Sequence, residues 1–358
     1  MKRFIEVCLI VWISSLSFAM EPQELTIECE IQESEIPGVR IHYFSSQETP
    51  LICPYFHQRY IAHDGTWFLC EGRKNDQSQL VRVDQEEGKG YFLTEKGAAA
   101  QIGDLGPKGS IYHFVRDKEI VGLDVLSGEE CVRWPLPKEE GYGLSRLIHI
   151  NADETLIAVS GNRKVDEEKK AGKIWTVSTK TGESRGVIEQ DFQIGHVQCS
   201  TLDPKLIMYC HETGGAAPQR MWRARTTGRH PGPLFDGPGH PWVTHESFCE
   251  NGKWVTFIRH PEGMGMIRPN NKNFIPIEAP GAWHCAGNED ASLVVFDTHN
   301  GSICLWERKT GKIEPITTGQ FHGGKVHCHP RFFPDGKSVI WTSTRNGSPH
   351  AAVARLPE

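Results

Sequence analysis

The feature that most constrains the fold is a recurring unit in which a polar turn precedes an apolar strand. Seven such turns occur at intervals of 53, 36, 50, 48, 39 and 45 residues. They are Asp64-Gly65, Asp117-Lys118, Asp153-Glu154, Asp203-Pro204, Asn251-Gly252, Asp290-Ala291 and Asp335-Gly336. A short run rich in β-branched and aromatic residues, typical of a strand, follows each turn. Units of 40–50 residues repeated in series are characteristic of β-propellers.

The second half of each unit has its own pattern, a strand that leads into a Thr-Gly turn. Residues 173–177 precede Thr181-Gly182, and residues 303–307 precede Thr310-Gly311. Long helical periodicity is absent. We therefore predict an all-β protein, a seven-bladed β-propeller of four-stranded antiparallel blades. We expect the segment near residues 39–43 to supply a strand that closes the ring.

The first residues are typical of an export signal. Lys2 and Arg3 precede an apolar run over residues 7–18, and Ser17 and Ala19 supply the small residues of a cleavage site. We predict a signal peptide over residues 1–19, a single propeller domain over residues 20–358, and export to the periplasm or the medium. No later stretch is long and apolar enough to span a membrane, so no membrane partner is expected.

Composition narrows the class of partner. The formal net charge of −6 argues against nucleic-acid binding, which normally requires a basic surface. None of the 11 cysteines forms a C-x-x-C pair, so a zinc finger or a thioredoxin-type site is not supported. Export would allow some cysteines to form disulfides, but single cysteines in strand-like runs favour a role as small buried residues. The sequence does not determine the oligomeric state.

Histidines recur at nearly the same distance before the blade turns. In a propeller this offset marks the start of the innermost strand, whose side chains face the central channel, so distant blades direct these residues at one small volume. The histidines that lie six to eight residues before a turn are His196, His245, His284, His327 and His329.

Three of these histidines are candidates for one metal site. Imidazole is a common ligand of divalent metals. His327 and His329 have i, i+2 spacing, which places both rings on one face of a strand. His284, from the preceding blade, reaches the same centre. The pattern predicts a divalent metal but does not select which one.

Further polar residues are expected near this centre. His211-Glu212 ends the strand after His196, and Gln219-Arg220 begins the next strand of that blade. Two interpretations of Arg220 remain open. It is either a packing residue paired with Glu212, or a fork that binds a substrate carboxylate.

The chain resembles the oligogalacturonate lyase family of pectate lyases, which is built on a seven-bladed propeller. The Cys-His-Glu, His-Glu and His-x-His elements, in that order, are the most specific signals, and the resemblance covers roughly residues 40 to 358. The matching segments include Gly195-His196-Val197-Gln198-Cys199, Cys210-His211-Glu212, Arg220-Met221-Trp222, His245-Glu246-Ser247-Phe248, Trp283-His284 and Val326-His327-Cys328-His329-Pro330.

This resemblance implies cleavage of oligogalacturonides, short pectin fragments, by β-elimination with a divalent metal, typically Mn²⁺. The family holds the metal with three histidines and a glutamine, and His284, His327 and His329 match the histidines. Gly324 occupies the position of the glutamine, so Gln320 or His322 is the candidate fourth ligand. His245 matches the proton-abstracting histidine and Arg220 the active-site arginine. We expect His196, His211 and Arg220 to bind the substrate.

Two other functions stay open. One is a non-catalytic propeller similar to periplasmic TolB-type binding modules, which would turn nothing over. The other is a metal-dependent lyase acting on a different uronic-acid oligomer, such as glucuronan or alginate fragments. A propeller-fused serine peptidase is disfavoured because no G-x-S-x-G motif follows the repeats.

Overall fold

The computed structural model describes residues 22–86, 88–94, 103–167, 169–213, 217, 219–235, 242–250, 252–320 and 326–357. The predicted signal peptide lies outside these residues. Every regular element in the described part of the chain is a β-strand. Among the same residues, no helix is long and apolar enough to cross a membrane.

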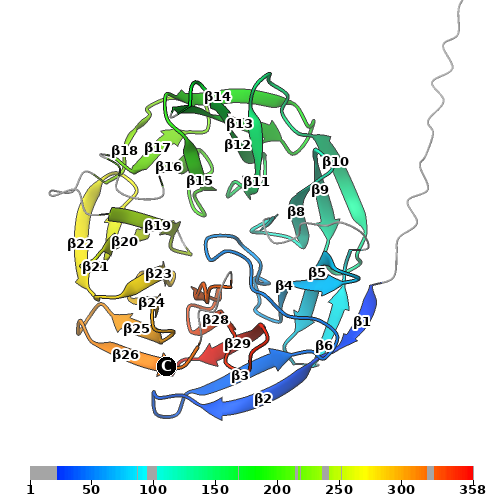
Figure 1. Ribbon diagram of the computed structural model, residues 1–358, viewed down its shortest axis with the longest axis vertical. Helices are drawn as coiled ribbons and strands as arrows, with labels where there is room; N and C mark the ends of the chain where they lie inside the picture. The colour runs from blue at the N-terminus through cyan, green and yellow to red at the C-terminus, as the bar shows by residue number, and fades with distance from the viewer. Residues whose placement is uncertain are drawn as a thin grey trace, which may run out of the picture.

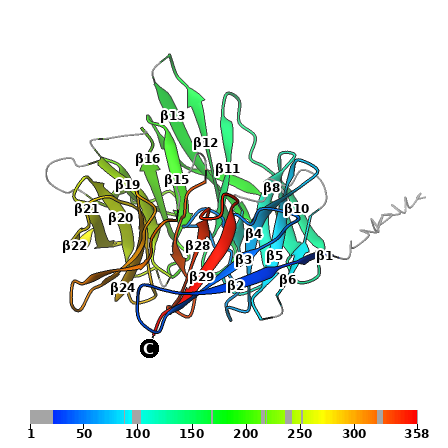
Figure 2. The same cartoon turned by 60° about the horizontal axis from the view of Figure 1, so that its bottom comes forward.

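Seven antiparallel sheets form a ring (Figure 1), so the predicted seven-bladed propeller is confirmed. Blade 1 contains β1 (Gln23–Thr26), β6 (Lys89–Phe92), β5 (Gln77–Asp84) and β4 (Trp67–Lys74). Blade 2 contains β7 (Asp104–Leu105), β8 (Ile111–Arg116), β9 (Glu119–Asp124) and β10 (Glu130–Pro135). Blade 3 contains β11 (Gly143–Ile150), β12 (Leu156–Lys164), β13 (Lys170–Ser178) and β14 (Ser184–Gln190). The long hairpin of β12 and β13 projects beyond the rest of the ring (Figure 2).

The other four blades follow in chain order. Blade 4 contains β15 (Ile194–Cys199), β16 (Leu206–His211), β17 (Met221–Arg225) and β18 (Gly232–Pro233). Blade 5 contains β19 (Trp242–Phe248), β20 (Val255–His260), β21 (Gly263–Arg268) and β22 (Lys272–Glu278). Blade 6 contains β23 (Ala282–Gly287), β24 (Leu293–Thr298), β25 (Ile303–Glu307) and β26 (Ile313–Thr317). Blade 7 contains β27 (Arg331–Phe332), β28 (Ser338–Ser343), β29 (His350–Arg355), β3 (Arg40–Ser45) and β2 (Glu28–Glu33).

The ring is closed by pairing between the two ends of the chain. Strand β3 pairs antiparallel with β29, with Phe44 opposite Ala351 and Ile41 opposite Ala354. The expected closing strand near residues 39–43 is therefore confirmed. Strand β2 adds a fifth strand to this blade, whereas the other six sheets have four.

Five of the predicted turns share one local structure, those at Asp64, Asp153, Asp203, Asp290 and Asp335, whereas Asn251 lies outside the described residues. The carboxylate of Asp64 accepts a hydrogen bond from the backbone N–H of Thr66, and Asp335 accepts one from Lys337. This Asx turn fixes the connection between the innermost strand and the next. The pair Asp117-Lys118 differs, because it lies at φ 50° and 67° in the hairpin between β8 and β9. That turn was thus assigned to the wrong connection of its blade.

Apolar side chains pack between adjacent blades rather than in one central core. Phe44 and Ile340 of blade 7, Phe68 of blade 1 and Phe114 of blade 2 belong to one buried cluster. The ten cysteines in the described part of the chain are all free, and eight of them are buried. This agrees with the prediction that they serve as small buried residues.

The innermost segment of blade 1 is irregular. Single bridges pair Ile52 with Glu71 and Ile61 with Phe68. These bridges are nine residues apart on the segment but only three apart on β4, so residues 53–60 must loop out. Figure 1 shows this segment extending into the middle of the ring. The centre of the propeller is therefore filled partly by side chains that no regular strand supplies.

Candidate functional site

Bulges in the innermost strands direct histidines at the channel. His196 and His245 each lie where the pairing of an innermost strand with its neighbour shifts register. Both have a left-handed backbone, with φ 44° at His196 and 53° at His245, and His329 has φ 50°. Such a backbone costs a non-glycine residue on the order of 1–3 kcal/mol and is concentrated at functional sites. Bulges commonly re-aim side chains in this way.

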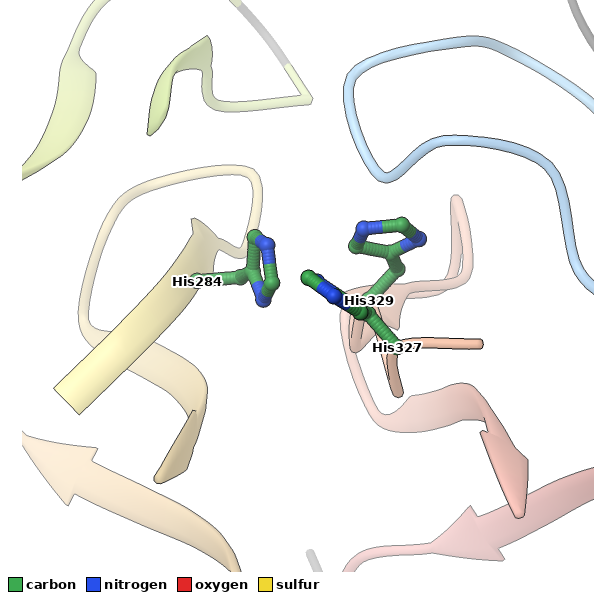
Figure 3. Close-up of side chains that lie close together, drawn as sticks. All are labelled: His284, His327 and His329. Carbon is green, nitrogen blue, oxygen red and sulfur yellow. The ribbon is translucent and has the colours of Figure 1, made fainter. Parts of the chain in front are cut away.

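His284, His327 and His329 form a compact group. One ring nitrogen from each lies within 4.8 Å of those of the other two. The ring centroid of His284 is 5.3 Å from that of His327 and 4.5 Å from that of His329. Figure 3 shows the three rings turned toward one another from β23 and from the segment before β27. This donor set suits a divalent transition metal.

Asp297 orients the buried ring of His284. Its carboxylate oxygens lie 2.9 and 3.1 Å from Nδ1 of His284, and one of them accepts a 2.7 Å hydrogen bond from the His284 backbone N–H. Because the carboxylate holds Nδ1, Nε2 is the nitrogen of His284 that can bind a metal ion together with the other two histidines. A carboxylate that holds the far nitrogen of a ligating histidine is a common feature of metal sites. The residues therefore fit a metal of the predicted kind.

The fourth ligand has no clear candidate in the described residues. The side-chain oxygen of Gln320 accepts a 3.1 Å hydrogen bond from Nε1–H of Trp341, and its amide nitrogen donates to the backbone oxygen of Thr318. Gln320 would have to give up the bond from Trp341 to ligate through that oxygen. His322 and Gly324 lie outside the described residues, so the role of His322 stays a prediction.

His245 lies directly against the three-histidine group. Its ring centroid is 4.2 Å from that of His284, and its Nδ1 is 3.1 Å from the phenol oxygen of Tyr55. Burial, together with the imidazoles of His284 and His196, holds the pKa of His245 well below its ordinary value. His245 is therefore a neutral imidazole near neutral pH, the form that accepts a proton.

Arg220 is buried between two carboxylates. Its Nε lies 3.3 Å from Glu246 and its Nη1 lies 3.5 Å from Glu212. Burial opposes the charge of the guanidinium, but Glu246 outweighs it and raises the pKa of Arg220. The pairing with Glu212, one of the two interpretations made from the sequence, is present. Its role toward a substrate carboxylate stays a prediction.

His196 belongs to the same charged group. Its Nδ1 lies 3.3 Å from Glu246 and its Nε2 lies 3.5 Å from Glu212. Burial favours the protonated form of Glu246, but Arg220 and His196 hold the pKa of this carboxyl well below its ordinary value. Ligand atoms of His196, Cys210 and Glu246 also lie within 4.8 Å of one another. Since Arg220 already supplies the positive charge there, we regard this group as an ion network.

His211 directly precedes Glu212, and its ring belongs to an aromatic group. Its ring stacks on Phe192 with centroids 4.2 Å apart, and Phe192 in turn contacts Trp222 at 5.5 Å. The side chain is half-buried. The substrate-binding role predicted for His211 is untested.

Three residues of the site were missed in the sequence analysis. Tyr55 comes from the irregular segment of blade 1, which has no repeat offset. Glu246 directly follows His245, and an acidic residue beside a channel histidine is a signal that was available. Asp297 ends the apolar run of β24, and a buried carboxylate in such a strand requires a partner, so it too was detectable.

Comparisons with known proteins agree with the resemblance found in the sequence. No family model matches the chain. Oligogalacturonate lyase of Dickeya dadantii (strain 3937) is 22% identical over 382 residues, which cover 94% of this chain and 98% of that protein. Oligogalacturonide lyase of Pectobacterium atrosepticum is 22% identical over 354 residues, which cover 85% of this chain and 90% of that protein.

Solved structures share the fold. An oligogalacturonate lyase in complex with manganese superposes with a TM-score of 0.84 at 21% identity, covering 94% of this chain and 98% of that one. An oligogalacturonate lyase from Vibrio parahaemolyticus gives 0.83 at 19% identity, covering 95% and 99%. The chain is thus similar to oligogalacturonate lyases in sequence and in architecture over nearly its whole length.

Proposed function

We propose that this protein is a metal-dependent lyase that cleaves oligogalacturonides by β-elimination. The observation that carries the proposal is the contact between His245 and the three-histidine group, 4.2 Å between the rings of His245 and His284. It combines a neutral proton acceptor with a set of metal ligands. The similarity to oligogalacturonate lyases supports the choice of substrate.

The cofactor we propose is a divalent metal, Mn²⁺, held by His284, His327 and His329. When bound, it offsets the charge of the uronate carboxylate and stabilises the negative charge that develops as C5 loses its proton. Asp297 holds the His284 ring in the orientation that this requires. A related structure contains manganese, which supports the choice of metal.

His245 acts as the general base in this proposal. The C5–H bond breaks and its proton moves to a ring nitrogen of His245. The electron pair forms the C4=C5 double bond, and the C4–O bond breaks. The departing oxygen takes up a proton from water and His245 later releases its proton to water, which leaves one saturated and one 4,5-unsaturated fragment and restores the neutral base. The low pKa of His245 keeps its ring neutral and ready to accept.

Arg220, His196 and His211 are the proposed contacts of the substrate. Arg220 lies against the carboxylates of both Glu246 and Glu212, and His196 contacts the same two carboxylates, so the charge of the guanidinium is already offset within the protein. We therefore expect these residues to orient the sugar through hydrogen bonds rather than to provide a strong cationic pocket.

The test is an assay with purified protein loaded with Mn²⁺ and supplied with digalacturonate. We expect a product that absorbs in the ultraviolet, because the new double bond is conjugated with the carboxylate. Chelation should abolish the signal and added Mn²⁺ should restore it. Absence of product from every uronate oligomer would refute the proposal and leave a non-catalytic binding module. Activity on glucuronan or alginate fragments alone would redirect it to another uronate.

A further inference from the structure

Tyr55 lies in the middle of the histidines although it belongs to none of the innermost strands. Its ring centroid is 4.7 Å from that of His329 and 5.8 Å from that of His196. The segment 53–60, which loops out of blade 1 between its two bridges, brings the phenol there. The insertion thus places one aromatic hydroxyl where several blades converge.

The phenol oxygen of Tyr55 lies 3.1 Å from Nδ1 of His245, within hydrogen-bonding distance. A tyrosine phenol, with an ordinary pKa of about 10, is neutral near pH 7. A neutral phenol can both donate and accept a hydrogen bond. A neutral imidazole has one N–H and one acceptor nitrogen, so the direction of this bond decides which nitrogen of His245 carries the proton.

The two adjacent imidazoles have different partners at Nδ1. His284 has the carboxylate of Asp297, which increases the basicity of a metal ligand. His245 has the uncharged phenol of Tyr55, which fixes the ring without adding charge. The two rings are only 4.2 Å apart, so their positions alone do not distinguish their roles. Their different partners at Nδ1 do: the carboxylate suits His284 as a metal ligand, and the phenol suits His245 as a base.

We propose that Tyr55 is a positioning residue that accepts a hydrogen bond from Nδ1–H of His245 and so leaves Nε2 as the proton acceptor. This rests on the proposed lyase function, in which His245 takes the C5 proton. An orienting partner that selects the tautomer of a general base is a recurrent device in enzymes. Tyr55 itself need not touch the reacting atoms.

The first test compares Tyr55→Phe with Tyr209→Phe. The control removes the hydroxyl of Tyr209 in blade 4, which accepts a 2.8 Å hydrogen bond from the side chain of Gln190 in blade 3. We expect Tyr55→Phe to lower kcat on the order of 10- to 100-fold, with KM and Mn²⁺ affinity within about twofold, and Tyr209→Phe to leave all three unchanged. An unchanged kcat in Tyr55→Phe would overturn the proposal.

The second test does not depend on turnover. In protein labelled with ¹⁵N-histidine and loaded with Zn²⁺, which is diamagnetic, the ring signals of His245 are assigned by their loss in His245→Gln. We expect the proton at Nδ1 in the wild type and a shift toward Nε2–H in Tyr55→Phe. A proton at Nε2 in the wild type would overturn the proposal even if the enzyme is active. A wild type with Nδ1–H but no lyase activity would instead refute the proposed function alone.

Discussion

Replacing Asp297 by asparagine should weaken metal binding while the blade stays folded. Asparagine keeps the size of the buried side chain and one oxygen for the 2.7 Å bond from the His284 backbone. It loses the charged contacts at 2.9 and 3.1 Å to Nδ1 of His284. Loss of such a partner typically costs about 10- to 100-fold in metal affinity. That factor corresponds to about 1.4–2.7 kcal/mol.

Isothermal titration of the metal-free protein with Mn²⁺ measures this effect. Asp290→Asn is the matched control, because Asp290 lies in a turn of the same blade and its carboxylate accepts a hydrogen bond from the Ser292 backbone. We expect the control to bind like the wild type. An Asp297→Asn variant that binds Mn²⁺ within about twofold of the wild type would refute the orienting role of this carboxylate.

Three further predictions concern the base, stability against pH and the leader. His245→Ala should lower kcat on the order of 10²- to 10⁴-fold and leave Mn²⁺ affinity nearly unchanged in titration. Burial lowers the pKa of His113 to about 4, so below about pH 6.5 the unfolded chain takes up a proton that the folded chain does not. Stability should therefore fall as pH drops through this window, by up to on the order of 3 kcal/mol, and His113→Phe should show a smaller fall in urea unfolding at pH 7 and 4.5. We propose export, so fractionation of the expressing cell should recover a chain that lacks residues 1–19 outside the cytoplasm, and a full-length cytoplasmic chain would contradict this.

Repeat phase explains why much of the site was predictable from the sequence. His284, His327 and His329 precede their turns by similar distances, and antiparallel blades convert equal offsets into equal positions on the ring. The left-handed backbone at His196 and His245 was not predictable in this way, because a bulge shifts register locally at each of them. The repeat therefore indicated which residues converge but not how their rings are aimed.

The site contacts that were not predicted from the sequence lie between blades or come from an irregular segment. Arg220 has one partner in its own blade, Glu212, and a second in the next, Glu246. Only the ring geometry brings Glu246 to it. Tyr55 was missed because the innermost segment of blade 1 spans nine residues where β4 spans three, so no offset applies. An irregular insertion does not follow the repeat, so the distance of a residue from the blade turn does not predict where its side chain lies. Only the folded structure shows this.

The position of the metal in a crystal grown with Mn²⁺ tests the central claim most directly. Anomalous diffraction should show one strong peak at bonding distance from ring nitrogens of His284, His327 and His329, with the ring of His245 beside it. A peak at His196 and Glu246 instead, or no peak at any histidine group, would contradict the assignment of the three histidines as ligands.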